Sequence, residues 1–363
     1  MKPYIIILIF AIFIISCDDD NVVVSSTTTN NNNQNNDTTD TDADVFYEWL
    51  IPVEEVFDGG PGKDGIPALT NPMLLQAADA NYLDNNDLIL GIVSGSEIVA
   101  YPHKILDWHE IINTSVGIHH ISVTYCPLTG TGIGWNRTVN GKITTFGVSG
   151  LLYNSNLIPY DRSTDSYWSQ IRSDCVYGEL AGNTVEDIKL IETTWLTWKI
   201  MYPSTLVVGE NTIFNRNYNV YPYGNYNEEE WLIFPVNPLD NRLPLKERVH
   251  GIIINNKAKA YRFSSFLNQN VLITDNFEGS ELLIVGNSTK NFIVSFFNDN
   301  SLVFEAVQDQ LPIILSDNEG NKWDVWGVAL EGPRLGEQLT NTNSFIGYWF
   351  SWGAFFPDLE IYQ

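Results

Sequence analysis

Two stretches far apart in the chain carry the same uncommon residues at the same spacing. Each has two glycines four residues apart, then two tryptophans and a proline at intervals of thirteen, three and five residues. The first set is Gly178, Gly182, Trp195, Trp198 and Pro203, and the second is Gly332, Gly336, Trp349, Trp352 and Pro357. Chance does not readily produce such agreement among rare residue types, so the pattern predicts a fold that is built twice.

A second match upstream extends the repeat. Gly91 precedes Ala100-Tyr101 by the same nine and ten residues that separate Gly251 from Ala260-Tyr261. We therefore expect Trp195 to superpose on Trp349, Trp198 on Trp352, and Tyr101 on Tyr261. The predicted boundaries are a first half at 46–208, a connector at 209–249 and a second half at 250–363.

Side chains that can ligate a metal, act as a nucleophile or transfer a proton gather in the first half only. The segment 101–137 holds four of the five histidines and one of three cysteines. These residues are His103, His109, His119, His120 and Cys126. The corresponding places of the second half read SSFLNQN and IVGNSTKN, without histidine or cysteine. Packing requirements are shared by both copies, so the tryptophans are predicted to be core, and any site is expected in the first half, with a degenerate counterpart in the second.

The N-terminus predicts export. Residues 1–17 combine a lysine, an apolar run and a small residue before Cys17, which is the pattern of a signal peptide. The tetrad IISC resembles a bacterial lipobox, which implies that Cys17 is lipidated with palmitate or a similar chain. Residues 18–45 are Asn, Thr and Asp with little to bury, so we expect a disordered tether. The prediction is a lipid-anchored protein of the bacterial outer membrane or cell surface.

The charge balance excludes one class of partner. Forty-four acidic and nineteen basic residues give a formal net charge of −25. Nucleic acids require a basic surface, so no nucleic-acid partner is expected. The partners that remain are the lipid anchor and an unknown small ligand or glycan.

Apolar periodicity predicts an α+β class: a strand-rich mixed fold with short helices. The segment 120–125 is β-branched and aromatic, which favours a strand that ends at Cys126. Ser94-Gly95-Ser96 between two apolar runs predicts a hairpin of 88–93 with 97–101. Helices are expected at 71–83, 103–113, 193–202 and 345–356. Further strands are expected at 133–139, 142–146, 282–285, 292–297 and 302–307.

An ordered set of motifs over residues 60–363 resembles the bacterial family known as domain of unknown function 3179. The motifs are GIPALTNP (65–72), AYP (100–102), DWHEIIN (107–113), TYCPLTGTG (124–132), TFGVSGLLYNSNL (145–157), YDRSTDSYWSQ (160–170), GELAG (178–182), TTW (193–195) and WFSWGAFFPDLEIY (349–362). The resemblance implies no activity, because none is established for the family. Its usual motif reads Cys-Pro-Leu-Cys-Gly, and Thr129 here takes the second cysteine position, so a dithiol mechanism does not carry over.

Cys126 is the first candidate for chemistry. It can be a functional thiol, a buried inert thiol, or half of a disulfide with Cys175. Paired with His109 across the fold, it would supply a nucleophile and a base, with Glu110 beside them. The same pair, with His120, would suit a soft transition metal such as copper or zinc. A helix histidine can equally be a structural hydrogen-bonding group.

A second set of polar and aromatic residues lies after Cys126, within the motifs that resemble the family. Asp161 and Arg162 are expected to form an ion pair that fixes a turn, or Arg162 offers a fork for a carboxylate or phosphate. The candidate ligand-binding residues are Thr129, Tyr153, Asn154, Tyr160, Asp161, Arg162 and Trp168.

Three functions are compatible with these residues. The first is a surface lipoprotein with a Cys126/His109 site for metal binding or thiol chemistry. The second is a glycan- or peptide-binding module in which those residues are structural. The third is a hydrolase that uses His109 with a carboxylate, either Glu110 or Asp161.

Overall fold

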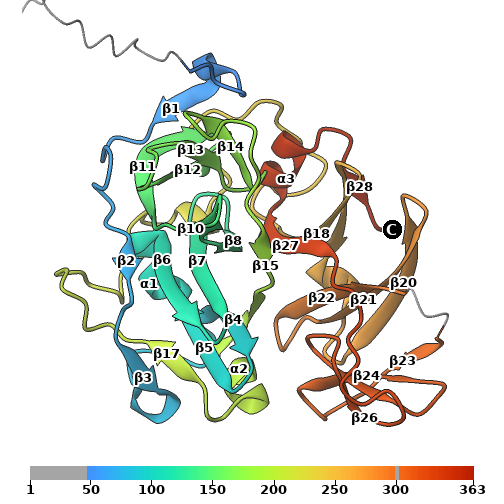
Figure 1. Ribbon diagram of the computed structural model, residues 1–363. Helices are drawn as coiled ribbons and strands as arrows, with labels where there is room; N and C mark the ends of the chain where they lie inside the picture. The colour runs from blue at the N-terminus through green and yellow to red at the C-terminus, as the bar shows by residue number, and fades with distance from the viewer. Residues whose placement is uncertain (1–46, 299–301) are drawn as a thin grey trace, which may run out of the picture. The chain divides into compact units, whose positions relative to one another are not determined.

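The computed structural model describes residues 47–298 and 302–363 (Figure 1). The predicted signal peptide, Cys17 and tether lie outside these residues. The described residues form one compact unit. The described residues are rich in strand, with three short α-helices, which confirms the α+β class. None of the described helices is long and apolar enough to cross a membrane.

Two sheets, one in each predicted half, share a strand arrangement. The first has the order β16-β4-β5-β17-β3 and the second has the order β27-β18-β19-β28. In each, a central antiparallel hairpin is flanked by an antiparallel strand that runs directly into a helix, and a parallel strand follows that helix. The strands of the first sheet are β16 (Ile191–Thr194), β4 (Leu88–Ser94), β5 (Glu97–Pro102), β17 (Leu206–Val208) and β3 (Leu74–Gln76). Those of the second are β27 (Asn343–Tyr348), β18 (Arg248–Ile254), β19 (Lys257–Arg262) and β28 (Glu360–Ile361).

A glycine in each central hairpin makes room for a tryptophan of the helix. The helices are α2 (Trp195–Met201) and α3 (Trp349–Phe355). Gly91 lies against the ring of Trp198, and Gly251 against the ring of Trp352. A Cβ at either glycine would meet a ring carbon at 2.3 Å, well inside van der Waals contact. Only a residue without a side chain therefore lets these helices pack onto their sheets.

The remaining strands form further sheets in each half, and almost all of their strand pairs are antiparallel. The meanders are β6 (Ile111–Val116), β7 (His119–Cys126) and β8 (Thr131–Asn136) in the first half, and β20 (Val271–Phe277), β21 (Ser280–Asn287) and β22 (Phe292–Phe297) in the second. The first meander also pairs with β2 (Leu69–Thr70) and β15 (Asp187–Ile188). A further sheet of the first half comprises β1 (Val56–Asp58), β11 (Phe146–Tyr153), β12 (Asn156–Asp161), β13 (Tyr167–Ser169) and β14 (Asp174–Tyr177). A further sheet of the second half comprises β23 (Phe304–Ala306), β24 (Ile313–Asp317), β25 (Lys322–Asp324) and β26 (Ala329–Glu331). A small ribbon pairs β9 (Thr138–Val139) with β10 (Lys142–Ile143).

Three of the expected helices differ from the structure. Residues 71–83 form β3 and a 3-10 turn at Ala77–Asp79 instead of a helix, because Asn71 has a positive φ of 44° and Leu74–Gln76 pair with β17. The helix expected at 103–113 stops after α1 (His103–His109), because Glu110 adopts the left-handed conformation and a strand follows. The helix expected at 345–356 begins only at Trp349, after β27.

The two halves share core and charge contacts. Trp195 and Trp198 belong to one buried cluster with residues of the second half, including Phe292 and Trp323. The Glu192 carboxylate, in β16, accepts a hydrogen bond from the Arg248 guanidinium of β18, in a buried ion pair. The two halves are therefore held together by a shared apolar core and by the contact between Glu192 of β16 and Arg248 of β18.

The predicted connector, 209–249, packs closely on the first half. Its 3-10 turn, Tyr226–Glu228, is held by Lys246, whose ammonium donates to the carbonyl oxygens of Tyr226, Glu229 and Trp231. The Tyr226 hydroxyl in turn donates to Leu128 O at 2.9 Å. The segment therefore delivers its tyrosines to the loop after Cys126.

Candidate functional site

Cys126 ends β7 as an uncharged, buried thiol. It is 1% exposed, and its Sγ lies 3.5 Å from Ser155 O. Cys126 and Cys175 are both free, so the disulfide alternative is wrong. Burial, and then the neighbouring Glu110 carboxylate, raise the pKa of the Cys126 thiol to about 11. A thiol with that pKa has little thiolate at neutral pH, which is the reverse of what a nucleophile needs.

Glu110 is the carboxylate whose charge contributes to the raised pKa of the Cys126 thiol. It caps α1 with φ 56° and is 6% exposed, and its Oε1 accepts a hydrogen bond from the Tyr223 hydroxyl at 3.0 Å. Burial raises the pKa of Glu110 to about 7. Cys126 and Glu110 thus share a largely apolar interior site.

His109 is committed to other partners. Its Nδ1 lies 2.7 Å from Pro67 O, and its Nε2 lies 2.7 Å from the Tyr218 hydroxyl. No hydrogen bond joins His109 to Cys126 in the part of the chain that the structure describes, so the two do not form a nucleophile–base pair here.

His120 and Cys126 lie at opposite ends of β7. Six residues of extended strand separate them by about 20 Å, too far to share one ion. Within residues 47–298 and 302–363, no three His, Cys, Asp or Glu side chains are grouped as a metal site. The metal set predicted from the sequence is therefore not assembled.

Thr129 belongs to a buried network of polar side chains. Its hydroxyl lies 2.8 Å from that of Thr131 and accepts a hydrogen bond from the Asn156 amide at 3.0 Å. Gln170 closes the network through Thr131 and Asn156. All four side chains are buried, so the network ties β12 to the turn before β8 and does not face a ligand.

The Asp161–Arg162 ion pair is wrong, because each residue has a different partner. Arg162 pairs with Asp64 at 2.6 Å, and Asp64 also accepts a hydrogen bond from the Tyr160 hydroxyl. Asn154 accepts from the backbone of Asn237 at 2.8 Å. The ring of Tyr153, the last residue of β11, packs against Phe355 of α3 with ring centroids 5.6 Å apart.

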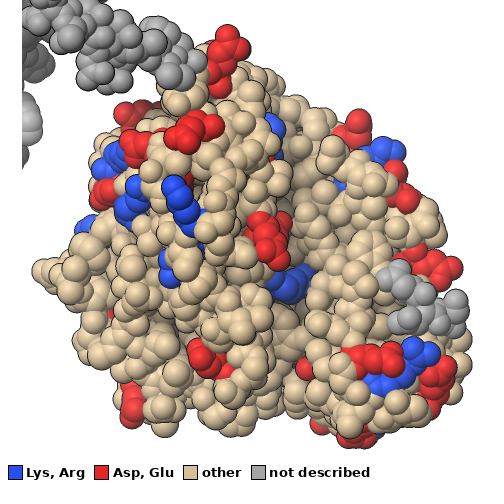
Figure 2. Space-filling view, in the orientation of Figure 1, with Lys and Arg blue, Asp and Glu red and all other residues tan. Residues whose placement is uncertain are grey.

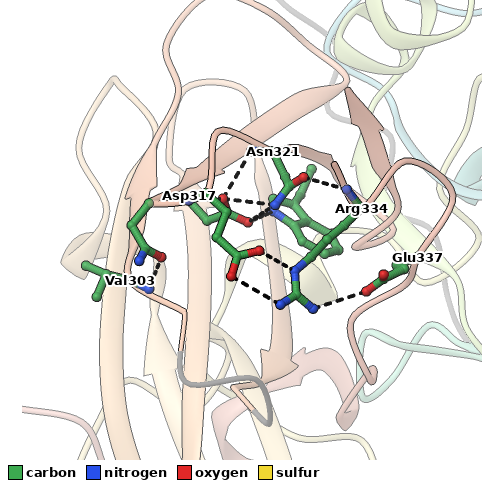
Figure 3. A network of polar contacts seen from close by, with 8 residues as sticks. Val303, Asp317, Asn321, Arg334 and Glu337 are labelled. Atoms are coloured by element: carbon green, nitrogen blue, oxygen red, sulfur yellow. Dashed lines mark hydrogen bonds and ion pairs between the residues drawn. The ribbon is translucent and has the colours of Figure 1, made fainter. Parts of the chain in front are cut away.

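Asp161 and Trp168 have a counterpart in the second half, which indicates a structural role. Asp161 Oδ2 accepts a hydrogen bond from the Trp168 indole at 3.1 Å, as Asp317 Oδ2 does from the Trp323 indole at 2.9 Å. Figure 3 shows the Asp317 turn, in which Asn321, Arg334 and Glu337 extend the polar contacts. The same aspartate–tryptophan bond occurs in both places, so packing alone accounts for it.

A cavity of about 310 Å³ lies beside the helix that carries the sequence-predicted histidines. We call its polar lining the tyrosine cleft, defined by His103, Asp107, Tyr125, Tyr221 and Tyr348. Three asparagines also line it: Asn86, Asn219 and Asn227. The cleft combines α1, β7, the connector and the end of β27.

Several polar groups of the tyrosine cleft have no protein partner. Among the described residues, the Asp107 carboxyl and the hydroxyls of Tyr125 and Tyr348 have no hydrogen bond. Unpaired polar groups at a cavity are costly to desolvate and are normally satisfied by water or a ligand. The three groups are therefore available to a bound molecule.

The cleft is close to electrically neutral. Burial, and then the nearby Glu110, raise the pKa of Asp107 well above its ordinary value, which favours the uncharged carboxyl. Burial and Arg248 lower the pKa of His103 to about 3, so its 3.9 Å contact with Glu192 is not an ion pair. Lys104 at the rim is paired with Asp87 at 2.7 Å.

Sequence reasoning located part of this cleft. His103, Asp107 and Tyr125 lie in the segment 101–137 that the sequence singled out, although only as background to His109 and Cys126. Tyr221 and Tyr348 carry no local signal, because their place in the cleft depends on tertiary packing of the connector and β27.

A family model described as "Protein of unknown function (DUF3179)" matches residues 63–359, which is most of the chain. The chain belongs to this family. The match covers both halves and the connector, so every wall of the cleft lies within the DUF3179 region. No curated protein and no solved structure matches the chain.

Proposed function

We propose that this DUF3179 chain is an exported, lipid-anchored protein that binds a neutral, polyhydroxylated ligand, such as a glycan, in the tyrosine cleft. The observation that carries the proposal is the set of unpartnered polar groups of Asp107, Tyr125 and Tyr348 around one cavity. Sugar hydroxyls both donate and accept hydrogen bonds, so they can satisfy all three groups. The tyrosine rings offer faces on which the apolar side of a sugar ring can pack.

The neutrality of the cleft argues against an ionic ligand. An anion or cation placed there would leave water without a compensating opposite charge, because Lys104 is already paired and His103 is neutral. This favours neutral oligosaccharides over those that carry uronic acids. The geometry gives weaker support to the thiol, metal and His109 hydrolase alternatives, because Cys126 is uncharged and His109 has both nitrogens engaged.

Tyr125→Phe together with Tyr348→Phe is expected to lower glycan affinity roughly 10–100-fold, because each lost hydrogen bond contributes about 1 kcal/mol. Isothermal titration of the full chain with neutral oligosaccharides, beside matched uronic-acid oligosaccharides, measures the effect. The melting temperature should not fall, because neither hydroxyl has a protein partner to lose.

The matched control is Tyr261→Phe, which removes a hydroxyl that donates to Asp275 at 2.8 Å in the second half. It should reduce stability and leave binding unchanged. Binding of the uronic-acid series alone, or equal affinity of the double variant and the parent, would contradict the glycan proposal.

The lipid anchor is a separate part of the proposal and rests on the IISC sequence that ends at Cys17. Cys17→Ser is expected to abolish labelling of the chain by radioactive palmitate and to remove it from the membrane fraction. A variant that still fractionates with membranes, with the label retained, would show that Cys17 is not the anchor.

We also propose that the fold arose by internal duplication, with halves at 46–208 and 250–363 joined by 209–249. Support comes from the shared strand order, from the paired contacts Gly91–Trp198 and Gly251–Trp352, and from the two aspartate–tryptophan bonds. In this view the two copies diverged after duplication, and the tyrosine cleft takes most of its lining from the first copy and the connector, with Tyr348 from the second.

A further inference from the structure

A second cavity of about 310 Å³ lies between β15 and β27, and no motif of the sequence predicted it. It is lined from the first half by the segment around β15 and β16 and from the second half by β18 and β27. Figure 2 shows this hollow with a basic group on its floor and acidic groups on its rim. Four polar residues that line it, together with Ser295, which is hydrogen-bonded to them, are called here the lysine–serine cluster: Lys189, His250, Ser295, Thr342 and Ser344.

The cluster is a continuous chain of hydrogen bonds. Lys189 Nζ lies 2.7 Å from Ser344 Oγ, which lies 3.0 Å from Thr342 Oγ1 and 3.3 Å from Ser295 Oγ. Ser295 Oγ lies 2.8 Å from His250 Nε2 at the far end. A primary amine, a serine hydroxyl and a second hydroxyl are thus in direct contact beside an accessible cavity.

The two sheets provide an internal comparison for these positions. Ile191 pairs with Gly91 and Phe345 pairs with Gly251, so the register of the two hairpins sets Leu90 with His250. Counted back along the chain from Ile191 and Phe345, Leu190 corresponds to Ser344, and Ile188 of β15 corresponds to Thr342. The first half has apolar side chains at all three places, so hydroxyls and an imidazole there are not a requirement shared by both halves.

Those apolar counterparts line the same cavity. Leu90, Ile188 and Leu190 form one wall, and His250, Thr342 and Ser344 contribute to the other. Glu192 also lines the cavity; its Oε2 is buried, has no hydrogen-bond partner among the described residues and lies 3.9 Å from His103 Nε2. A ligand with an apolar acyl group on one side and a hydrogen-bond donor on the other would satisfy both walls.

We propose that Ser344 is a nucleophile activated by Lys189, and that this cavity hydrolyses small esters. The neutral Lys189 amine takes the Ser344 hydroxyl proton while Oγ bonds to the ester carbonyl carbon. The bond from that carbon to the leaving alcohol oxygen then breaks, and the alcohol takes the proton from Lys189. Water attacks the acyl-Ser344 ester, its proton passes through Lys189 to Ser344 Oγ, and the carboxylic acid leaves.

The electrostatics suit this role for the lysine. Burial lowers the pKa of Lys189 to about 8, against the opposing effect of Asp187, so a useful fraction of the amine is uncharged near neutral pH. Ser295 and Thr342 supply hydroxyls that hold the Ser344 oxygen in place. The activity would be independent of glycan binding in the tyrosine cleft.

The test is acylation of the purified full chain by p-nitrophenyl acetate and by a fluorophosphonate probe, with the adduct located by peptide mass spectrometry. The expected result is a covalent adduct on Ser344, with a rate that rises as pH increases through about 8. Ser344→Ala should abolish the adduct, and Lys189→Met should slow it at least about 100-fold. Ser264→Ala, at an exposed position outside the cavity, is the control and should react as the parent does.

Lys189→Arg separates catalysis from folding, because arginine keeps the charge and a donor to Ser344 but cannot act as a base. Its melting temperature should stay near that of the parent while acylation is lost. An adduct absent from Ser344 in the parent, or formed equally fast in the folded Lys189→Arg variant, would overturn the proposal.

Discussion

Glu110→Gln is expected to make the protein more stable than the parent at pH 8–9 and equally stable below about pH 4.5. Burial raises the pKa of Glu110 from 4.5 to about 7, so the folded state prefers the protonated carboxyl. That preference stabilises the parent fully below the unfolded pKa and is lost as pH rises through the folded pKa. The difference of about 2.5 pKa units corresponds to roughly 3 kcal/mol at high pH.

The glutamine side chain mimics the protonated acid, and it can still accept the hydrogen bond from Tyr223. Urea unfolding of both chains from pH 4 to pH 9 measures the expected divergence. Glu179→Gln, at an exposed position, is the control and should follow the parent at every pH. Parallel stability curves for Glu110→Gln and the parent would mean that Glu110 is not held protonated in the fold.

Gly91→Ala and Gly251→Ala are each expected to destabilise the chain by about 3 kcal/mol, the upper part of the range for overpacked cores. In each case the new methyl would meet a buried tryptophan ring at 2.3 Å, and neither Trp198 nor Trp352 has free space to retreat into. Urea unfolding or the shift in melting temperature gives the cost.

The two glycine variants should respond alike, since a Cβ at either glycine meets a buried tryptophan ring at the same distance of 2.3 Å. Adding Trp198→Phe to Gly91→Ala, or Trp352→Phe to Gly251→Ala, should recover part of the loss, because the smaller ring leaves room for the methyl. Gly209→Ala is the control: its nearest neighbour is the flexible Leu75 side chain at 3.1 Å, so its cost should stay below about 1 kcal/mol. Unequal costs for Gly91→Ala and Gly251→Ala would show that the two glycine–tryptophan contacts are not energetically equivalent.

The spacing of apolar and turn residues predicted correctly those elements that are determined by residues close together in the chain. The hairpin of 88–93 with 97–101 is confirmed by β4 and β5, and the helix at 193–202 by α2. Residues 71–83 look helical in isolation, but pairing with β17 overrides that preference. The apolar spacing of 103–113 continues past His109, and nothing in it reports that Glu110 turns the chain into a strand.

The candidate site likewise has residues that the sequence singled out and residues that only tertiary contacts bring together. The segment 101–137 that the sequence singled out includes His103, Asp107 and Tyr125, which line the tyrosine cleft. The sequence emphasised Cys126 and His109 for their chemistry, but it does not report the burial that raises the pKa of Cys126 or the tertiary contacts that engage both ring nitrogens of His109. Lys189 and Ser344 were not noticed, since their relation exists only through the contact of two sheets distant in sequence.

Residues of β27 line both cavities, so neither cavity can form during folding until this strand has docked. Tyr125 meets Tyr348 and Lys189 meets Ser344 only after more than 150 residues of intervening chain are in place. Contacts this distant form late, because the entropy of closing the loop must first be offset by other pairings. A truncated chain that ends before β27 would have neither cavity complete, so ligand binding and acylation would both report the docking of β27.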